Sequence, residues 1–103
     1  MIRYTTPIIP MTVDADLTGF TIKVSFTQGS QKVTKAVTEI EVEDDVTSFS
    51  VPLTQQESGK FSATSQVQVQ VNAIDANGTR LATDIEMINI FENLLPEVLS
   101  YGG

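Results

Sequence analysis

The chain has 103 residues, of which 41% are hydrophobic and 18% are charged, and its 13 acidic and 6 basic residues give a formal net charge of -7. This balance predicts one folded domain and excludes a disordered chain, and the acidic charge argues against nucleic acid and anionic membranes as partners. The chain has no cysteine and no histidine, which removes the usual groups of thiol, zinc and imidazole chemistry. We therefore expect a protein that is not an enzyme and needs no cofactor and no metal.

Apolar residues recur at a period of two along most of the chain, which is typical of strands with one buried face. Residues 20–27 predict the first clear strand, and residues 31–37 predict its hairpin partner after a glycine turn at 28–30. Residues 39–43 alternate glutamate with apolar side chains and predict a short edge strand that its charges keep soluble. Residues 46–53 predict the next strand.

A helical turn is predicted after the strand that ends near residue 53. Thr54 followed three positions later by Glu57 forms a capping box, and Gly59 is expected to end the turn. A single turn of helix is too short for the crossover that joins parallel strands. The sequence therefore predicts antiparallel connections.

The next strand, residues 66–73, places valine and alanine on one face and uncharged amides on the other. The amide positions are Gln66, Gln68, Gln70 and Asn72. Amides on a strand can simply be solvated, but a surface without charge also lacks the usual defence against pairing. These four residues are the candidate interaction face, and both readings stay open here.

After a hairpin turn at residues 75–78, residues 81–91 change the phase of their alternation, which predicts a bulge or a change of partner. These elements predict an all-β fold, an antiparallel immunoglobulin-like β-sandwich of about seven strands with one short helical turn. A small, partly open barrel is the competing architecture. We expect a single domain over residues 1–103, with flexible arms at about 1–6 and 96–103.

The acidic turns offer the remaining candidates for chemistry. Asp14 with Asp16, and Asp44 with Asp45, could act as paired carboxylates, but short acidic turns are typical of local hydrogen bonding to the backbone. The turn that begins at Asp75 has part of the spacing of a calcium loop but lacks glycine at the sixth position. We interpret all of these carboxylates as turn residues.

Three segments together resemble a known family, namely residues 20–28, residues 51–61, and the glutamine–valine strand 67–71 that leads to the Asn-Gly turn at 77–78. They are similar to small phage proteins of Gram-positive hosts that are related to the N-terminal immunoglobulin-like domain of phage baseplate upper proteins. The resemblance covers residues 6–95 approximately. Because the sequence ends at Gly103, before any coiled-coil or receptor-binding segment, we expect an adaptor subunit rather than a host adhesin.

The resemblance implies a non-enzymatic phage or prophage structural protein, a protein–protein interaction module of the tail or baseplate. Its partners would be other phage tail or baseplate proteins, with a homo-oligomer as a further expectation. It would be made in the host cytoplasm without a signal peptide and be located in the virion. The alternative function is a carbohydrate-binding β-sandwich for host cell-wall recognition, for which Tyr4 and Tyr101 are the expected exposed rings.

Overall fold

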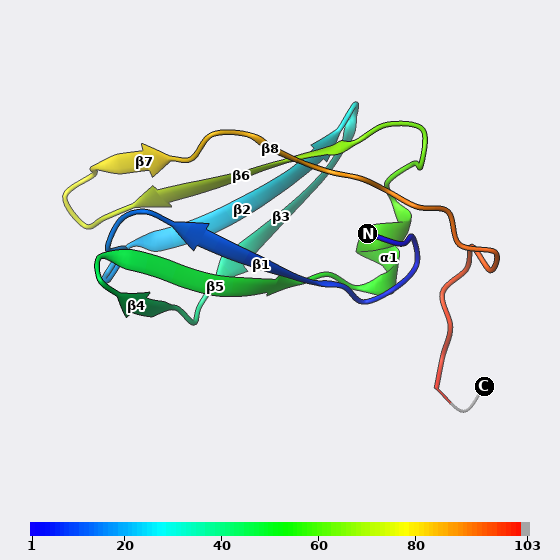
Figure 1. The fold of residues 1–103 in the computed structure, drawn as a ribbon, viewed down its shortest axis with the longest axis horizontal. Helices are drawn as coiled ribbons and strands as arrows, with labels where there is room; N and C mark the ends of the chain where they lie inside the picture. Colours follow the sequence, from blue (N-terminus) through cyan, green and yellow to red (C-terminus); the bar gives the residue numbers. More distant parts are fainter. Residues whose placement is uncertain (102–103) are drawn as a thin grey trace.

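A computed structural model describes residues 1–101, which fold into two packed antiparallel sheets and one short helix (Figure 1). The eight strands and the helix of these residues are β1 (Ile8–Val13), β2 (Thr21–Gln28), β3 (Gln31–Val37), β4 (Glu41–Glu43), β5 (Val46–Pro52), α1 (Gln55–Gly59), β6 (Val67–Ile74), β7 (Arg80–Ala82) and β8 (Glu86–Ile88). The predicted all-β sandwich with one helical turn is confirmed.

The strand order identifies the type of sandwich. The smaller sheet has the order β1-β5-β4, and the larger has the order β3-β2-β6-β7, with β8 also paired to β6. These are the B-E-D and C′-C-F-G orders of the immunoglobulin fold. Within residues 1–101 no strand belongs to both sheets, so the structure is a sandwich and not the competing barrel.

Residues 1–101 form eight strands where about seven were expected. The last predicted strand is divided into β7 and β8, and β1 lies in a segment for which no strand was predicted. β7 and β8 pair with opposite halves of β6, and residues 83–85 lie between them. At the break, the Thr83 hydroxyl accepts a hydrogen bond from the Val71 N–H at 3.0 Å, while the Thr83 N–H donates to the Val71 carbonyl. The side chain thus replaces a backbone acceptor where the alternation changes phase.

The core lies between the sheets and consists of the side chains that the alternation places inward. Phe26 and Val69 face each other in the register between β2 and β6, and both are almost fully buried. Phe49 and Val51 of β5 cover them from the smaller sheet. Each such side chain contributes about 1.5–3 kcal/mol when it is fully buried, so the inward phase of each strand is strongly specified.

The predicted capping box is present at α1. The Thr54 hydroxyl accepts from the Glu57 N–H at 3.1 Å, and the Glu57 carboxylate accepts from the Thr54 N–H at 2.9 Å. Gly59 is the last residue of the helix, and a Cβ there would lie 2.5 Å from the Tyr4 ring. Glycine is therefore needed for close packing rather than for an unusual backbone angle.

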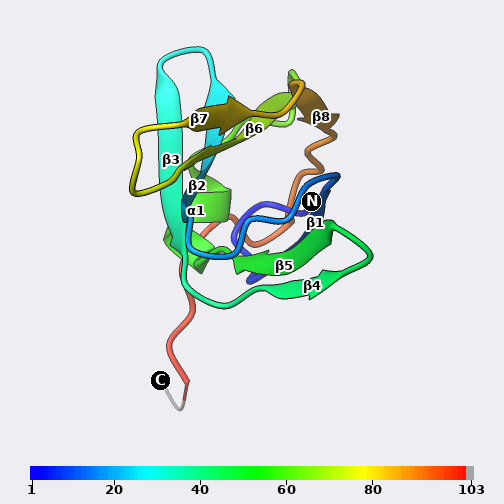
Figure 2. The same ribbon diagram turned by 90° about the vertical axis from the view of Figure 1, so that its left-hand side faces the viewer.

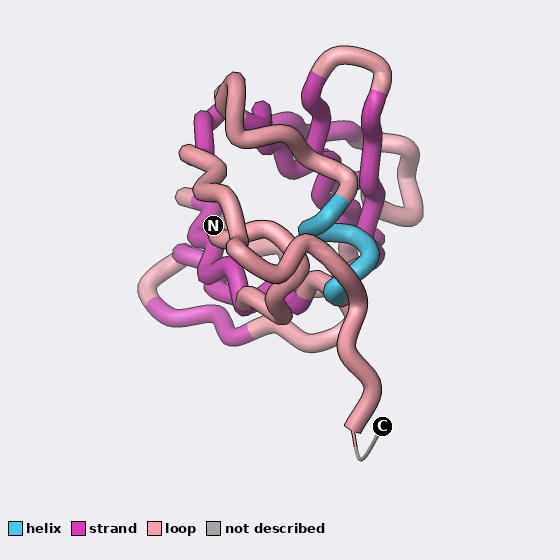
Figure 3. Tube along the Cα trace, turned by 90° about the vertical axis from the view of Figure 1, so that its right-hand side faces the viewer, coloured by secondary structure: helices cyan, strands magenta, loops and turns pink. Residues whose placement is uncertain are grey.

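The N-terminal residues lie against the segment that follows β8. Ile2 forms a parallel bridge with Phe91, and the Phe91 N–H donates to the Met1 carbonyl at 2.8 Å. The later segment then passes α1 (Figure 3). There the Gln55 amide hydrogen-bonds to both the N–H and the carbonyl of Leu99. Flexibility of the two arms stays a prediction, and residues 102–103 of the second arm lie outside the described part of the chain.

Candidate functional site

The candidate site is the surface of the larger sheet that points away from the smaller sheet, which we call the outer face. In each strand, alternate side chains point into the core, and the outer face is formed by the side chains between them, which point the other way. In the strand register these residues are Thr21, Lys23, Ser25, Thr27, Lys32, Thr34, Ala36, Gln68, Gln70, Asn72, Ile74, Arg80, Ala82 and Met87.

The four predicted amide residues lie in one row: three belong to β6, and Gln66 directly precedes it. β6 is an interior strand, because β2 pairs with one of its sides and β7 and β8 pair with the other. Gln66 and Gln68 are exposed, whereas Gln70 and Asn72 are half-buried. The amides therefore belong to a sheet face, and strand addition at β6 is blocked on both sides.

Hydrogen bonds orient three of the four amides. Gln66 donates to the Asn89 side-chain oxygen at 2.8 Å, and Gln70 donates to the Thr83 carbonyl at 2.9 Å. The Asn72 oxygen accepts from the Arg80 guanidinium at 3.1 Å. Within residues 1–101 the Gln68 amide has no side-chain hydrogen bond, so its donors and acceptor are free for a partner.

Three cationic side chains lie on the outer face beside the amides, and the sequence of the amide strand alone did not predict this arrangement. Lys23, Lys32 and Arg80 are exposed and come from three different strands, and the outer face carries no carboxylate. In the described part of the chain none of the three makes an ion pair, whereas Arg3 and Lys35 are paired with carboxylates. In a protein with 13 acidic residues this face is locally positive.

A shallow depression of about 370 Å³ lies on the outer face. It is lined by amides, hydroxyls, two cations and one exposed apolar side chain, namely Ser25, Thr27, Lys32, Gln68, Gln70, Asn72, Arg80 and Ile85. Its walls offer both hydrogen-bond donors and positive charge, which together suit a carboxylate or another anionic oxygen.

Of the acidic residues considered for chemistry, Asp16 and Asp75 accept hydrogen bonds within their own turns, whereas Asp14 makes no ion pair within residues 1–101. The Asp16 carboxylate accepts from the hydroxyl and the N–H of Thr18, and these two hydrogen bonds hold the pKa of Asp16 below its ordinary value. Asp75 accepts from two backbone N–H groups of its own turn. Asp44 and Asp45 form the tight turn between β4 and β5. No group of three acidic side chains within residues 1–101 is arranged to hold a metal ion.

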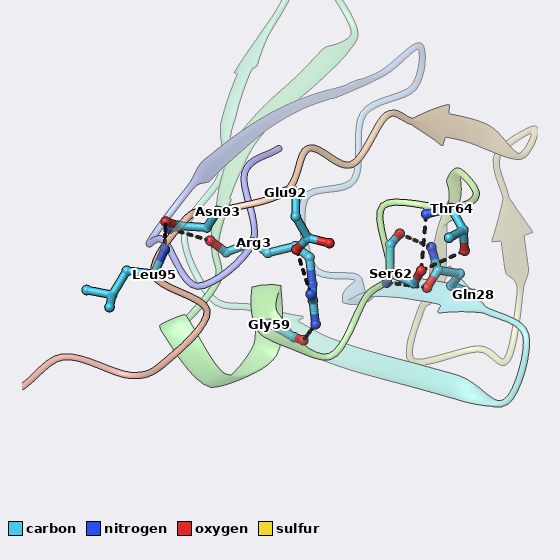
Figure 4. Close-up of polar contacts among 8 residues, drawn as sticks. All are labelled: Arg3, Gln28, Gly59, Ser62, Thr64, Glu92, Asn93 and Leu95. Atoms are coloured by element: carbon cyan, nitrogen blue, oxygen red, sulfur yellow. Dashed lines mark hydrogen bonds and ion pairs between the residues drawn. The ribbon is translucent and has the colours of Figure 1, made fainter.

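Two clamps that join segments far apart in the chain were missed by the sequence reasoning (Figure 4). The Gln28 amide donates to the carbonyls of Ser62 and Ser65 and accepts from the Ser62 N–H, so it holds the loop that leads to β6. Arg3 donates to the Gly59 carbonyl and to Glu92. Their partners lie 34 to 89 positions away in the chain, and nothing in the local sequence indicates such pairing.

Comparison of the chain with protein-family models, with curated proteins and with solved structures gives no match. No helix in the described residues has the length and apolar character needed to cross a membrane.

Proposed function

We propose that this protein is a non-enzymatic structural protein whose outer face binds other proteins. The observation that supports this most strongly is the absence of carboxylates from the outer face of residues 1–101, together with three unpaired cations and an uncharged row of amides. A surface that is only solvated normally mixes both signs of charge. A face of one sign in a chain of the opposite sign favours contact with an acidic protein surface.

A phage tail or baseplate is the setting that we propose for this activity. The support is the resemblance of three segments to phage baseplate domains, which are immunoglobulin-like, together with the immunoglobulin strand order of this chain. In this setting the protein is a virion component and an adaptor, and its partners are other tail or baseplate proteins.

Two measurements test this proposal. Mass spectrometry of purified phage particles should detect the protein, and its absence from particles would reject the virion setting. Co-encoded tail and baseplate proteins, tested one by one, should include a partner whose binding is lost in the triple variant Lys23→Gln, Lys32→Gln and Arg80→Gln. The variant Lys60→Gln is the matched control, because Lys60 is exposed but lies beside α1, away from the outer face.

Carbohydrate binding is the second candidate, and the depression on the outer face is the observation that favours it. Its amides and hydroxyls suit the hydroxyl groups of a sugar. The depression has no aromatic lining residue on which a sugar ring would stack, and the Tyr4 ring is covered by the Arg3 guanidinium at 5.3 Å. Specific binding on a glycan array that is lost in Gln68→Ala would favour this candidate over the first.

A further inference from the structure

We propose that the outer face of one copy of this protein binds the acidic hairpin of a second copy, where the acidic hairpin is defined as residues 39–45. This inference rests on the proposed function, because it names the partner of the same face. It is supported by charge, by the placement of the two surfaces in the fold, and by the chemistry of the depression.

The acidic hairpin concentrates negative charge on one protruding edge. It contains five of the 13 acidic residues, namely Glu39, Glu41, Glu43, Asp44 and Asp45, and all five are exposed. In the described part of the chain none of them forms an ion pair. The acidic hairpin and the positive outer face thus both lack ion-pair partners within residues 1–101, and their charges are complementary.

The two surfaces cannot meet within one molecule. The acidic hairpin includes β4, which is an edge strand of the smaller sheet, whereas the outer face belongs to the larger sheet and points away from the smaller one. Figure 2 shows β4 and β7 on opposite sides of the sandwich. A contact between these surfaces therefore has to join two copies.

The chemistry of the hairpin tip matches that of the depression. Asp44 and Asp45 form the tip, with φ angles of 51° and 61° that give a tight turn. Lys32 and Arg80 in the depression can each pair with a carboxylate, and the free amide of Gln68 can donate to one. The two aspartates of the tip thus have three donor groups opposite them.

The contact joins two different surfaces, which determines the kind of assembly it produces. When one surface of each copy binds another surface of the next, copies add head to tail into a ring or an open filament. Each copy then uses its outer face once and its acidic hairpin once. Assembly should therefore depend on protein concentration and should stop when one of the two surfaces is neutralised.

Two complementary variants test this inference. The face variant carries Lys23→Gln, Lys32→Gln and Arg80→Gln, and the hairpin variant carries Glu41→Gln, Glu43→Gln, Asp44→Asn and Asp45→Asn. Asparagine tolerates the positive φ angles of the tip, so the turn is retained. In sedimentation velocity we expect the wild-type protein to form species larger than a dimer and each variant alone to stay monomeric. An equimolar mixture should form a dimer and nothing larger, because each variant keeps one functional surface.

The controls separate this inference from the proposed function. Lys60→Gln and Glu97→Gln remove charges outside the two surfaces and should assemble like the wild type, and circular dichroism should show that every variant is folded. A wild-type protein that stays monomeric, or variants that assemble as it does, would reject pairing between copies. If the face variant nevertheless loses a tail or baseplate partner, the proposed function stands without self-assembly.

Discussion

At the scale of single residues, the buried hydroxyl of Thr47 shows how polar groups are accommodated inside the sandwich. Thr47 is 0% exposed on β5, at the inner face of the smaller sheet. Its hydroxyl accepts from the Leu17 N–H at 2.9 Å and donates to the Ala15 carbonyl at 2.7 Å. One side chain thus satisfies two backbone groups of the loop between β1 and β2.

Replacing this hydroxyl should destabilise the fold. Thr47→Val keeps the shape of the side chain but leaves the Leu17 N–H and the Ala15 carbonyl without their partner, at a cost of about 1–3 kcal/mol in the free energy of unfolding. The control is Thr12→Val, because Thr12 is exposed on the neighbouring strand. Urea denaturation measures both changes, and equal stability of the two variants would contradict the role assigned to Thr47.

The ion pair between Lys35 and Glu57 links the larger sheet to α1 at 2.8 Å. Burial raises the pKa of Glu57, but hydrogen bonds from Lys35 and the Thr54 backbone, with the charge of Lys35, outweigh it and leave the pKa below its ordinary value. The unfolded chain therefore binds a proton more readily than the folded one. The stabilisation is complete above the ordinary glutamate pKa and is lost as the pH falls through the lowered value.

Lys35→Met should make the protein less sensitive to acid. Its stability at neutral pH should fall by less than about 1 kcal/mol, because the pair is partly exposed. The further loss of stability on acidification below about pH 4 should be smaller than in the wild type, since the pKa of Glu57 moves back towards its ordinary value. Urea denaturation across the acid range measures this, with Lys60→Met as the control. If the loss of stability on acidification were the same as in the wild type, Thr54 alone would lower the pKa of Glu57.

At the scale of elements, β6 gives the sharpest contrast between two neighbouring positions. Val69→Lys would place an ammonium group opposite Phe26 in the core and should unfold the domain, at a cost of several kcal/mol. Gln68→Lys lies on the outer face and should change the stability by no more than about 0.5 kcal/mol. Thermal denaturation followed by circular dichroism compares them. A similar loss in both would mean that the two faces of β6 are wrongly assigned.

At the scale of the whole molecule, net charge and local charge act in opposite directions on association. Two copies with charges of -7 at a separation of 31 Å, the middle extent of the molecule, would repel by about 7 kcal/mol in water without salt. At 0.1 M salt the Debye length is about 10 Å, which reduces the repulsion to a few tenths of a kcal/mol. Contacts between adjacent charges are screened less. Moderate salt should therefore favour the proposed pairing.

Association should pass through a maximum as salt is added. Repulsion between whole molecules dominates at very low salt, and screening of the contacts themselves dominates at high salt. Light scattering at constant protein concentration over a sodium chloride series measures this. Association that only increases with salt would instead indicate apolar contacts. The exposed apolar side chains after β8 would then form them, namely Phe91, Leu94, Leu95, Val98, Leu99 and Tyr101.

The local sequence did not predict β1 or the position of the break at residues 83–85. It was sufficient to predict the other strands, the inward face of each, the capping box at Thr54 and a change of phase within residues 81–91. These features depend on alternation and on contacts between residues that are close in the chain, so a short window contains their cause. The alternation of β6 showed which valines are buried, and the structure agrees at Val67, Val69 and Val71.

Only the tertiary structure decided which strands are neighbours. Alternation specifies the buried side of a strand but not its partner, because pairing joins residues far apart in the chain. The interior position of β6, the bridge from Ile2 to Phe91 and the hydrogen bonds of Thr47 to Leu17 and Ala15 all depend on contacts between such distant residues. The same is true of the outer face, whose cations Lys23, Lys32 and Arg80 come from three strands and surround the amides only when those strands are aligned in one sheet.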